Sequence, residues 1–492
     1  MNEHSAPPAA ALPLQRYSNV IGGKSAAASG GAALDVLCPS DGRAFATLPR
    51  STAADVDRAV TAARGAFAGA WGRLTATERG RLLMKLGRAI EDNAAELAAL
   101  ESRDAGKPLK QGKADIVAAA RYFEYYGSAA DKLHGDTIPF LDGYTVATIR
   151  DPHGVTGHII PWNYPAQMFG RTVAPALACG NACVVKPAED ACLNSIRFCE
   201  LARDVGFPDG ALNVVAGLGG EAGAALSAHA GIDFISFTGS PETGALIQAN
   251  AARNHIACTL ELGGKSPQIV FADADFDKAL PACVNAIVQN GGQTCSAGSR
   301  VLIERNAYDA FASALAARFA AVRVGHHEMD LDAGPLISAR QQRRVEGFIA
   351  RARADGLPVL AQGLIAPGSP AGGFYVAPVM FGPVPHSNSL AYDEVFGPVL
   401  SLMPFEDEAD AVRLANGTPY GLVAGVWTGN AARSMRVARA MRCGQVFING
   451  FGAGGGIELP FGGVKKSGHG REKGFEALYE FSALKTIVIN HG

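Results

Sequence analysis

The sequence predicts an α/β protein that contains two doubly wound parallel sheets. Between residues 153 and 264, short apolar segments alternate with helical segments at the spacing of βαβ units, and the alternation returns between residues 265 and 463. Residues 132–152 instead combine turn residues with an alternating apolar pattern, which predicts a β-hairpin. At 492 residues, the chain is long enough for about three domains with a large buried core.

The first section of the chain is expected to mix short strands and helices. Residues 1–16 are rich in alanine and proline and are expected to be disordered. A capping box, Thr75 to Glu78, opens the second of three expected helices. The expected strands are residues 18–23, 33–38 and 44–48, and the expected helices are residues 53–68, 75–90 and 113–130.

The two α/β sections supply the remaining elements. In the first of them, strands are expected at residues 155–160, 182–185, 212–216 and 232–237, and helices at 167–177, 193–205 and 220–229. In the second, strands are expected at 268–271, 300–303, 399–404 and 423–427, and helices at 307–322, 339–355 and 408–415. Parallel doubly wound sheets bind ligands beyond the carboxyl ends of their strands, so polar motifs at those ends are candidate site residues.

Composition and charge exclude several classes of protein. With a formal net charge of -2 and an isoelectric point near 6.6, the chain lacks the excess of basic residues that is typical of proteins that bind nucleic acid or an anionic membrane. There is no apolar run of about 18 residues for a transmembrane helix, and residues 1–14 lack the basic start of a signal peptide. Nine scattered cysteines without zinc spacing predict reduced thiols in a cytoplasmic protein that has no metal site.

Residues 237–244 form the best candidate phosphate site. A strand ends at Gly239, and a helix is expected to start with Ser240 as its N-cap and Pro241 at its first position. Backbone amides at such a helix start suit a pyrophosphate, although structural capping alone also explains the pattern. Two other glycine clusters fit worse, because residues 217–223 miss the dinucleotide fingerprint by one place and residues 263–266 lack the first glycine of a P-loop.

Cys295 is the candidate nucleophile. It lies among glycines and small hydroxyl residues between Gly291 and Arg300, so that no bulky neighbour covers its sulfur. A single free cysteine is more often a small buried hydrophobe, and other motifs must therefore decide between the two interpretations. Six further motifs occur at residues 161–165 (PWNYP), 186–189 (KPAE), 237–240 (FTGS), 260–265 (LELGGK), 394–398 (EVFGP) and 460–463 (PFGG).

In this order and spacing the chain resembles the NAD(P)-dependent aldehyde dehydrogenase superfamily, from about Tyr17 to the C-terminus. The resemblance implies an aldehyde dehydrogenase-like fold with two doubly wound α/β domains plus a β-hairpin oligomerisation arm. It implies an NAD-binding domain over residues 1–129 and 153–264, the hairpin over 130–152, a catalytic domain over 265–463 and a C-terminal segment over 464–492. The strand 483–490 would complete the arm of a homodimer or homotetramer, the alternative being an ordinary surface hairpin.

The resemblance also implies a reaction. Cys295 would attack an aldehyde to form a thiohemiacetal, and the Asn163 amide and the backbone N–H of Cys295 would hold the oxyanion. After hydride transfer, Glu261 would activate the water that hydrolyses the thioester. Family members that pass the acyl group to coenzyme A generally lack this glutamate, so the acid-forming reaction is favoured. A coenzyme A-acylating enzyme and an inactive binding or structural protein are the alternatives.

NAD is the cofactor that the resemblance favours, and NADP is less favoured. A carboxylate at position 189 would bond the 2'-hydroxyl of the adenosine ribose and repel a 2'-phosphate. The implied cofactor contacts are Trp162, Lys186, Glu189, Gly239, Ser240, Glu394 and Phe396.

The substrate class stays open. The resemblance implies a tunnel lined by Tyr164, Met168, Arg171 and Ser296, together with Gln289 and the loop 451–456. Members that oxidise semialdehydes often carry an arginine at the position of Arg171, where it meets the far carboxylate. Gln289 and Gly456 depart from that pattern, and the glycine run in the loop suits aromatic or aliphatic aldehydes. The alternative for Arg171 is a structural pairing with a helix neighbour or with another subunit.

Overall fold

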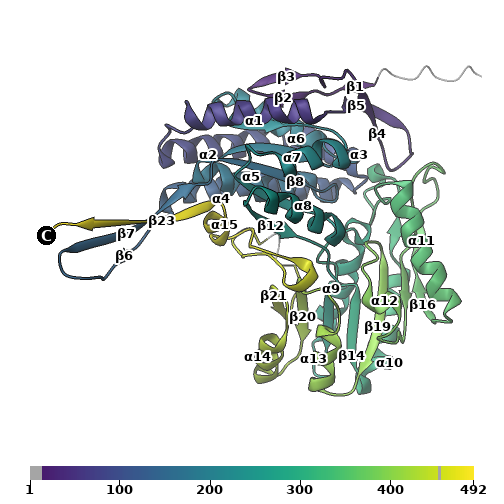
Figure 1. The fold of residues 1–492 in the computed structure, drawn as a ribbon. Helices are drawn as coiled ribbons and strands as arrows, with labels where there is room; N and C mark the ends of the chain where they lie inside the picture. Colours follow the sequence, from purple (N-terminus) through teal and green to yellow (C-terminus); the bar gives the residue numbers. More distant parts are fainter. Residues whose placement is uncertain (1–13, 453–455) are drawn as a thin grey trace, which may run out of the picture.

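The computed structural model describes residues 14–452 and 456–492, which form two large sheets, two small ones and a projecting arm (Figure 1). The first sheet has eight strands in the order β22-β12-β11-β8-β9-β10-β2-β3, and the second has seven in the order β16-β18-β19-β14-β13-β20-β21. In the second sheet, and in the first sheet from β8 onward, the chain starts near the middle and extends first to one side and then to the other, whereas β2 and β3 lie at one edge of the first sheet. The prediction of an α/β fold with two doubly wound sheets is confirmed.

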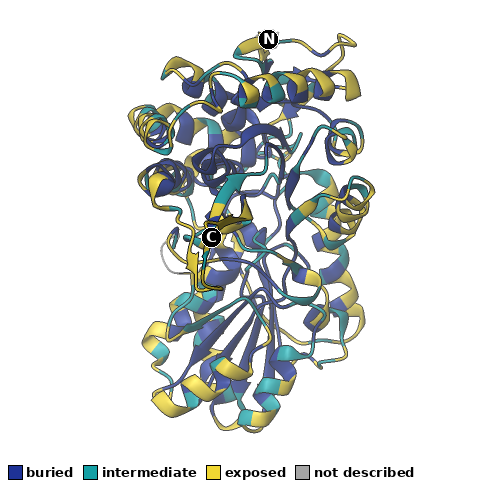
Figure 2. Cartoon of the chain, turned by 60° about the vertical axis from the view of Figure 1, so that its left-hand side comes forward, coloured by how far each residue is buried: buried dark blue, intermediate teal, exposed yellow. Residues whose placement is uncertain are grey.

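The first sheet is parallel over its five central strands. Its strands are β2 (Asn19–Ile21), β3 (Lys24–Ala26), β8 (Val155–Ile160), β9 (Ala182–Pro187), β10 (Leu212–Val214), β11 (Phe234–Thr238), β12 (Ala257–Glu261) and β22 (Gly468–His469). Its helices are α1 (Ala53–Ala68), α2 (Ala76–Asp92), α3 (Ala94–Ala105), α4 (Leu109–Ala129), α5 (Pro165–Cys179), α6 (Leu193–Asp204), α7 (Ala224–Ala228) and α8 (Pro241–Arg253). Figure 2 shows that the strands are buried while the outer faces of the helices are exposed, as expected for a sheet covered on both sides.

The second sheet has one antiparallel edge, where β16 pairs with β18. Its strands are β13 (Pro267–Val270), β14 (Arg300–Glu304), β16 (Val359–Gln362), β18 (Val379–Phe381), β19 (Val399–Phe405), β20 (Val423–Trp427) and β21 (Gln445–Ile448). Its helices are α9 (Phe276–Val288), α10 (Tyr308–Ala320), α11 (Ala339–Ala354), α12 (Ser389–Tyr392), α13 (Glu408–Asn416) and α14 (Ala431–Ala440). The last helix, α15 (Glu476–Glu480), packs against α5 in the core of the first sheet and leads into the arm.

Local sequence signals predicted several boundaries correctly. The bounds of α1 and β8 are those expected, and the capping box of α2 forms, because Thr75 and Glu78 bond each other's backbone N–H groups. The expectation of disorder through residue 16 is wrong for Gln15 and Arg16, which form β1 and pair with β5 (Ala44–Pro49). The rest of that expectation, for residues 1–13, lies outside the described residues.

The arm is a three-stranded antiparallel sheet (Figure 1). The predicted hairpin forms from β6 (Thr137–Ile138) and β7 (Tyr144–Pro152), and the C-terminal strand β23 (Ser482–Asn490) pairs with β7 along its whole length. Apolar side chains on the arm remain exposed, among them Ile138, Phe140, Leu141, Leu484, Val488 and Ile489. Within residues 14–452 and 456–492, no helix has the length and apolar character needed to cross a bilayer.

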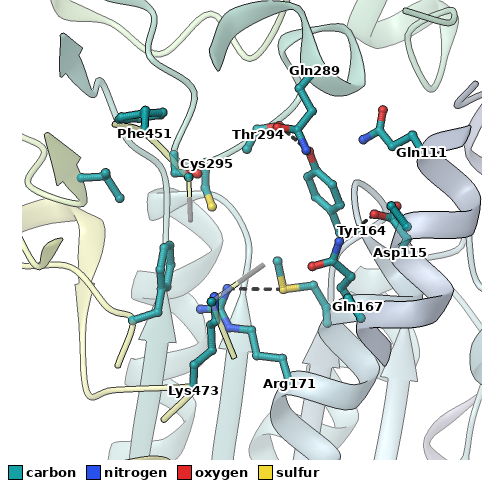
Figure 3. A pocket seen from close by; sticks show the side chains of 18 of the residues that line it. Gln111, Asp115, Tyr164, Gln167, Arg171, Gln289, Thr294, Cys295, Phe451 and Lys473 are labelled. Atoms are coloured by element: carbon teal, nitrogen blue, oxygen red, sulfur yellow. Dashed lines mark hydrogen bonds between the residues drawn. The ribbon is translucent and has the colours of Figure 1, made fainter. Parts of the chain in front are cut away.

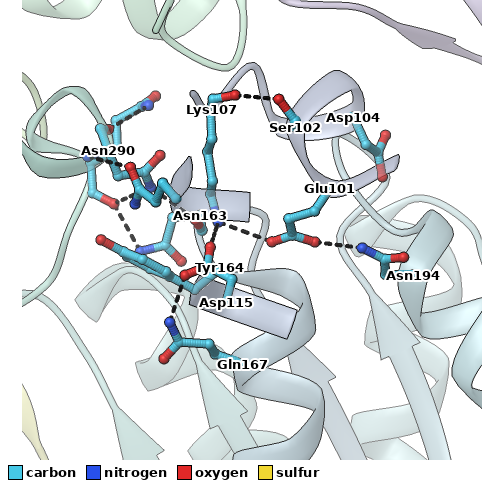
Figure 4. A network of polar contacts seen from close by, with 12 residues as sticks. Glu101, Ser102, Asp104, Lys107, Asp115, Asn163, Tyr164, Gln167, Asn194 and Asn290 are labelled. Carbon is cyan, nitrogen blue, oxygen red and sulfur yellow. Dashed lines mark hydrogen bonds and ion pairs between the residues drawn. The ribbon is translucent and has the colours of Figure 1, made fainter. Parts of the chain in front are cut away.

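A buried ionic network ties together the helices next to the cavity (Figure 4). The Lys107 ammonium lies 2.9 Å from Glu101 Oε1 on α3 and 2.5 Å from Asp115 Oδ2 on α4, and all three side chains are buried. Asn194 on α6 donates to Glu101 at 2.8 Å, and Gln167 on α5 donates to Asp115 at 2.6 Å. One lysine therefore holds two carboxylates that in turn reach four helices.

We expect Lys107→Met to destabilise the protein by about 3–5 kcal/mol, because two carboxylates would be left buried without a cation. Burial raises the pKa of Asp115 to about 6, and Lys107 opposes that rise. Without the lysine, the folded protein would retain this proton to higher pH, so the stability deficit should grow between pH 5 and pH 8. Thermal unfolding midpoints at both pH values would measure the effect.

The control variant is Arg88→Met, which removes exposed ion pairs with Glu91 and Asp92. It should change stability by no more than about 1 kcal/mol. Equal midpoints for the two variants would contradict a structural role for the Lys107 network.

Candidate active site

A cavity of about 520 Å³ opens beside Cys295 (Figure 3). The expected substrate residues Tyr164, Met168, Arg171 and Ser296 all line it, and Gln289 lies on the same wall. From the expected loop 451–456, the cavity includes Phe451, Gly452 and Gly456, whereas residues 453–455 lie outside the described part of the chain. The structure therefore brings the candidate nucleophile and the expected substrate residues into one space.

Backbone conformation places the Cys295 loop. After α9, the residues Asn290, Gly291 and Gly292 adopt left-handed φ angles of 52°, 61° and 73°, and this reverses the chain. A Cβ added at Gly292 would overlap the backbone of Gly397. Glycine is needed at this position for both its conformation and the close approach. The small residues that surround Cys295 in the sequence thus serve its placement.

The Cys295 thiol is neutral at rest. Its side chain is half-buried at the cavity wall, and desolvation raises its pKa to about 12, against a lowering effect of the Arg171 guanidinium and a raising effect of the Glu261 carboxylate. A thiol with this pKa is a poor nucleophile until a base takes its proton. If Cys295 is the nucleophile, a base in the site has to take its proton as it attacks.

Asn163 is held against the same loop. Its side-chain amide donates to the carbonyl of Gln293 at 3.0 Å, while Asn290 donates to the Asn163 carbonyl at 2.8 Å. Asn163 is 4% exposed, so its orientation is fixed by protein contacts. A primary amide has two N–H donors, and the second can serve an oxyanion that forms at Cys295.

Glu261 ends β12 and is buried beside Arg171. Desolvation raises its pKa well above the ordinary value, and the Arg171 guanidinium opposes that rise. Arg171 Nη2 lies 3.4 Å from Glu261 Oε2, and Arg171 Nε lies 2.5 Å from Glu472 Oε2. The arginine thus pairs with two carboxylates from distant parts of this chain, and on its own helix it donates to the Met168 sulfur at 3.7 Å. Sequence reasoning missed Glu472, which no motif marks.

The expected phosphate site lies at the switch point of the first sheet. The chain leaves β8 for β9 on one side and later places β11 on the other, so the crevice opens between the ends of β8 and β11. Gly239 follows β11 directly, and Ser240 caps α8 by accepting the backbone N–H of Thr243 at 3.3 Å. The predicted N-cap and the predicted Pro241 at the first helical position are both confirmed.

Lys186 and Glu189 form a second polar group beyond β9. Lys186 Nζ lies 2.8 Å from Glu189 Oε2, and the Gly219 N–H donates to Glu189 Oε1 at 3.4 Å. Sequence reasoning set residues 217–223 aside because their spacing does not fit the dinucleotide fingerprint. The structure nevertheless places this loop against Glu189, and its run of glycines was the signal that could have indicated the contact.

Glu394 and Phe396 approach from the second sheet. Glu394 Oε1 accepts the Gly264 N–H at 2.8 Å, and a Cβ on Gly263 would overlap the same carboxylate. Desolvation raises the pKa of Glu394 to about 7. Phe396 has a left-handed φ of 58°, and its ring meets that of Trp162 edge-on at 5.4 Å. These expected cofactor residues therefore lie together, next to the strand that carries Glu261.

Known proteins match the chain over nearly its whole length. The sequence model of the aldehyde dehydrogenase family matches residues 26–487. Aldehyde dehydrogenase family 2 member B4, mitochondrial, of Arabidopsis thaliana is 41% identical over 95% of this chain and 87% of its own length. Retinal dehydrogenase 2 of Homo sapiens is 40% identical over 93% of this chain and 89% of its own.

Solved structures agree in fold. A Burkholderia cenocepacia protein assigned as an aldehyde dehydrogenase superposes with a TM-score of 0.96 at 62% identity, covering 96% of this chain and 100% of the other. Betaine aldehyde dehydrogenase of Staphylococcus aureus, solved in complex with NAD+, gives a TM-score of 0.94 at 35% identity, covering 96% of this chain and 95% of the other. With the Cys295 cavity and the full-length sequence match, these likenesses show that the chain belongs to the aldehyde dehydrogenase family.

Proposed function

We propose that the protein oxidises an aldehyde to the carboxylic acid with NAD, through a thiohemiacetal and a thioester on Cys295. The observation that carries this proposal is the grouping of a cavity-lining thiol, a buried carboxylate and a fixed primary amide, contributed by Cys295, Glu261 and Asn163. A nucleophile, a base and an oxyanion donor are the parts that acyl chemistry at a carbonyl requires.

The proposed steps move protons through Glu261. The Cys295 sulfur bonds to the carbonyl carbon as its proton passes to Glu261, which releases it to solvent before hydrolysis, and the Asn163 amide and the Cys295 N–H hold the oxyanion. The bound nicotinamide supplies the acceptor for the hydride that leaves this carbon, and a thioester remains. Glu261 takes a proton from water as the water adds to the thioester, and the carbon–sulfur bond breaks to release the acid and restore the thiol.

The cofactor residues fit a dinucleotide. The start of α8 offers backbone amides to a pyrophosphate, the Lys186–Glu189 pair offers a cation and a carboxylate to the adenosine ribose, and Glu394 offers acceptors to the second ribose. NAD+ is bound in the Staphylococcus aureus relative. Glu189 favours NAD over NADP, because a 2'-phosphate would face a carboxylate.

We expect Glu189→Gln to raise the ratio of kcat/KM for NADP to that for NAD by about tenfold or more. The substitution keeps the shape of the side chain and removes the like-charge repulsion, which costs up to several kcal/mol at close range. NADH and NADPH formation at 340 nm would give the ratio. An unchanged ratio would mean that another group sets the cofactor preference.

The substrate is an aromatic or aliphatic aldehyde in our proposal, in preference to a semialdehyde. Arg171 already meets two carboxylates, which leaves little of its charge for a substrate carboxylate. Two lysines also line the cavity: burial lowers the pKa of Lys473 to about 7, and Lys110 Nζ donates to the Asp330 carbonyl at 3.1 Å. Aromatic side chains form part of the cavity wall, namely those of Tyr122, Tyr164, Phe447, Phe451 and Phe461.

With NAD as cofactor, the purified protein should have a higher kcat/KM for benzaldehyde and medium-chain aldehydes than for succinic semialdehyde. Cys295→Ala should abolish this reaction. Glu261→Gln should lower kcat by about 10²–10⁴, the usual contribution of a general base. NADH formation at 340 nm and assay of the acid would measure both.

Two results would direct the proposal elsewhere. Product formation that requires coenzyme A would indicate the acylating reaction. Wild-type protein that is inactive with every aldehyde would favour a binding or structural role.

The arm supports a homodimer or homotetramer. An exposed apolar strand edge invites pairing with another chain, and Leu484 and Val488 on β23 are 57% and 56% exposed in the single chain. All nine cysteines are free thiols, which supports the cytoplasm as the location.

We expect the double variant Leu484→Asp, Val488→Asp to elute as a monomer, because charged side chains on one face of β23 would oppose its burial in an interface. Size-exclusion chromatography with light scattering would measure the mass. Leu364→Asp, which alters a residue of similar exposure (62%) far from the arm in sequence, serves as the control and should keep the native mass. An oligomer in both variants would overturn the role of the arm.

A further inference from the structure

Arg171 lies between two carboxylates and above an aromatic ring. Its guanidinium is 3.4 Å from Glu261, 2.5 Å from Glu472 and 4.3 Å from the centre of the Phe461 ring. Arg171, Glu261 and Glu472 are 4%, 2% and 1% exposed. Figure 3 shows Arg171 reaching from α5 toward the floor of the cavity near Lys473. Contacts on several sides therefore restrict the arginine to this position.

Glu472 is anchored independently of Arg171. Its Oε1 accepts the hydroxyl of Ser236 at 2.8 Å, and Ser236 in turn accepts the hydroxyl of Thr172 at 2.7 Å. Its backbone forms a β-bridge with Phe461, whose ring lies beneath Arg171. Because Ser236 and the bridge with Phe461 hold Glu472 in place, Glu472 can keep the Arg171 guanidinium next to Glu261.

We propose that Arg171 is a positioning residue for the general base: it keeps the Glu261 carboxylate ionised and in place. Glu472 limits this effect, because it pairs with the same guanidinium. This inference rests on the proposed function, because it requires Glu261 to act as a base. It gives Arg171 a role distinct from anchoring the carboxylate of a semialdehyde, and it explains how a carboxylate without a hydrogen bond in the described structure can stay ionised.

The charges that face Glu261 determine the sign of each effect. Burial raises its pKa, Arg171 and Arg471 lower it, and Glu472 and Glu480 raise it. Cys295 and Lys473 also interact electrostatically with Glu261. Loss of the positive charge at position 171 should raise the pKa of Glu261, whereas loss of the negative charge at position 472 should lower it.

The test is the pH dependence of kcat in two variants. A base is active when deprotonated, so kcat falls on the acid side of the pKa of Glu261. Arg171→Met should move this acid limb to higher pH by about one unit, and Glu472→Gln should move it to lower pH. Opposite shifts from neighbouring substitutions are not expected from a general loss of packing.

Further variants complete the test. Arg171→Lys should restore the wild-type limb in part, because it returns the charge without the planar group, and it remains informative if Arg171→Met does not fold. Arg64→Met, which removes the distant ion pair with Asp233, is the matched control and should leave the limb unchanged.

The outcomes separate the two proposals. In each variant, the acid limb of the kcat–pH profile should shift by the same amount with benzaldehyde as with succinic semialdehyde. A rise in KM confined to the semialdehyde in Arg171→Met, or an acid limb that does not move in either variant, would overturn the positioning role while leaving the enzyme intact. Wild-type protein without aldehyde oxidation would overturn the proposed function itself, and this inference with it.

Discussion

A short connection between the two sheets determines the geometry of the site. Residues 262–266 join β12, which ends with Glu261, to β13, the first strand of the second sheet. Side chains are excluded at two places in this link, because a Cβ on Gly263 would overlap Glu394 and a Cβ on Gly264 would overlap the carbonyl of Cys295. The proposed base, the proposed nucleophile and the expected ribose ligand are therefore close together because the backbone between them carries no side chain.

The end of the chain completes this arrangement from the other side. Ser467 donates to the Gly263 carbonyl at 2.7 Å, and β22 pairs with β12 so that Gly468 lies opposite Glu261. Four residues after Gly468, Glu472 reaches Arg171, and β23 then pairs with β7 in the arm. The C-terminal segment thus joins the first sheet, the base and the arm.

Sequence reasoning succeeded where the signal is local. The N-cap at Ser240, the capping box at Thr75 and the apolar strand β8 depend on neighbouring residues, and they formed as expected. It missed the helices α3, α9, α12, α14 and α15. Contacts between distant residues could not be read from spacing. Glu472 meets Arg171 only because a late antiparallel strand joins the sheet, and Gly219 meets Glu189 only because the loop after β10 folds over the end of β9.

The charges around Glu261 are better explained by chemistry than by stability. Buried ion pairs cost desolvation that their attraction roughly balances, and well-packed apolar residues of similar volume are often as stable or more stable. One arginine and two carboxylates, all almost fully buried, therefore stabilise the fold no better than apolar side chains of the same volume would. A carboxylate that must be ionised in a desolvated site does need a nearby cation, and a second carboxylate limits how far that cation depresses its basicity. The triad of Glu261, Arg171 and Glu472 meets both needs, which is why we assign it to the proton transfer and not to the core.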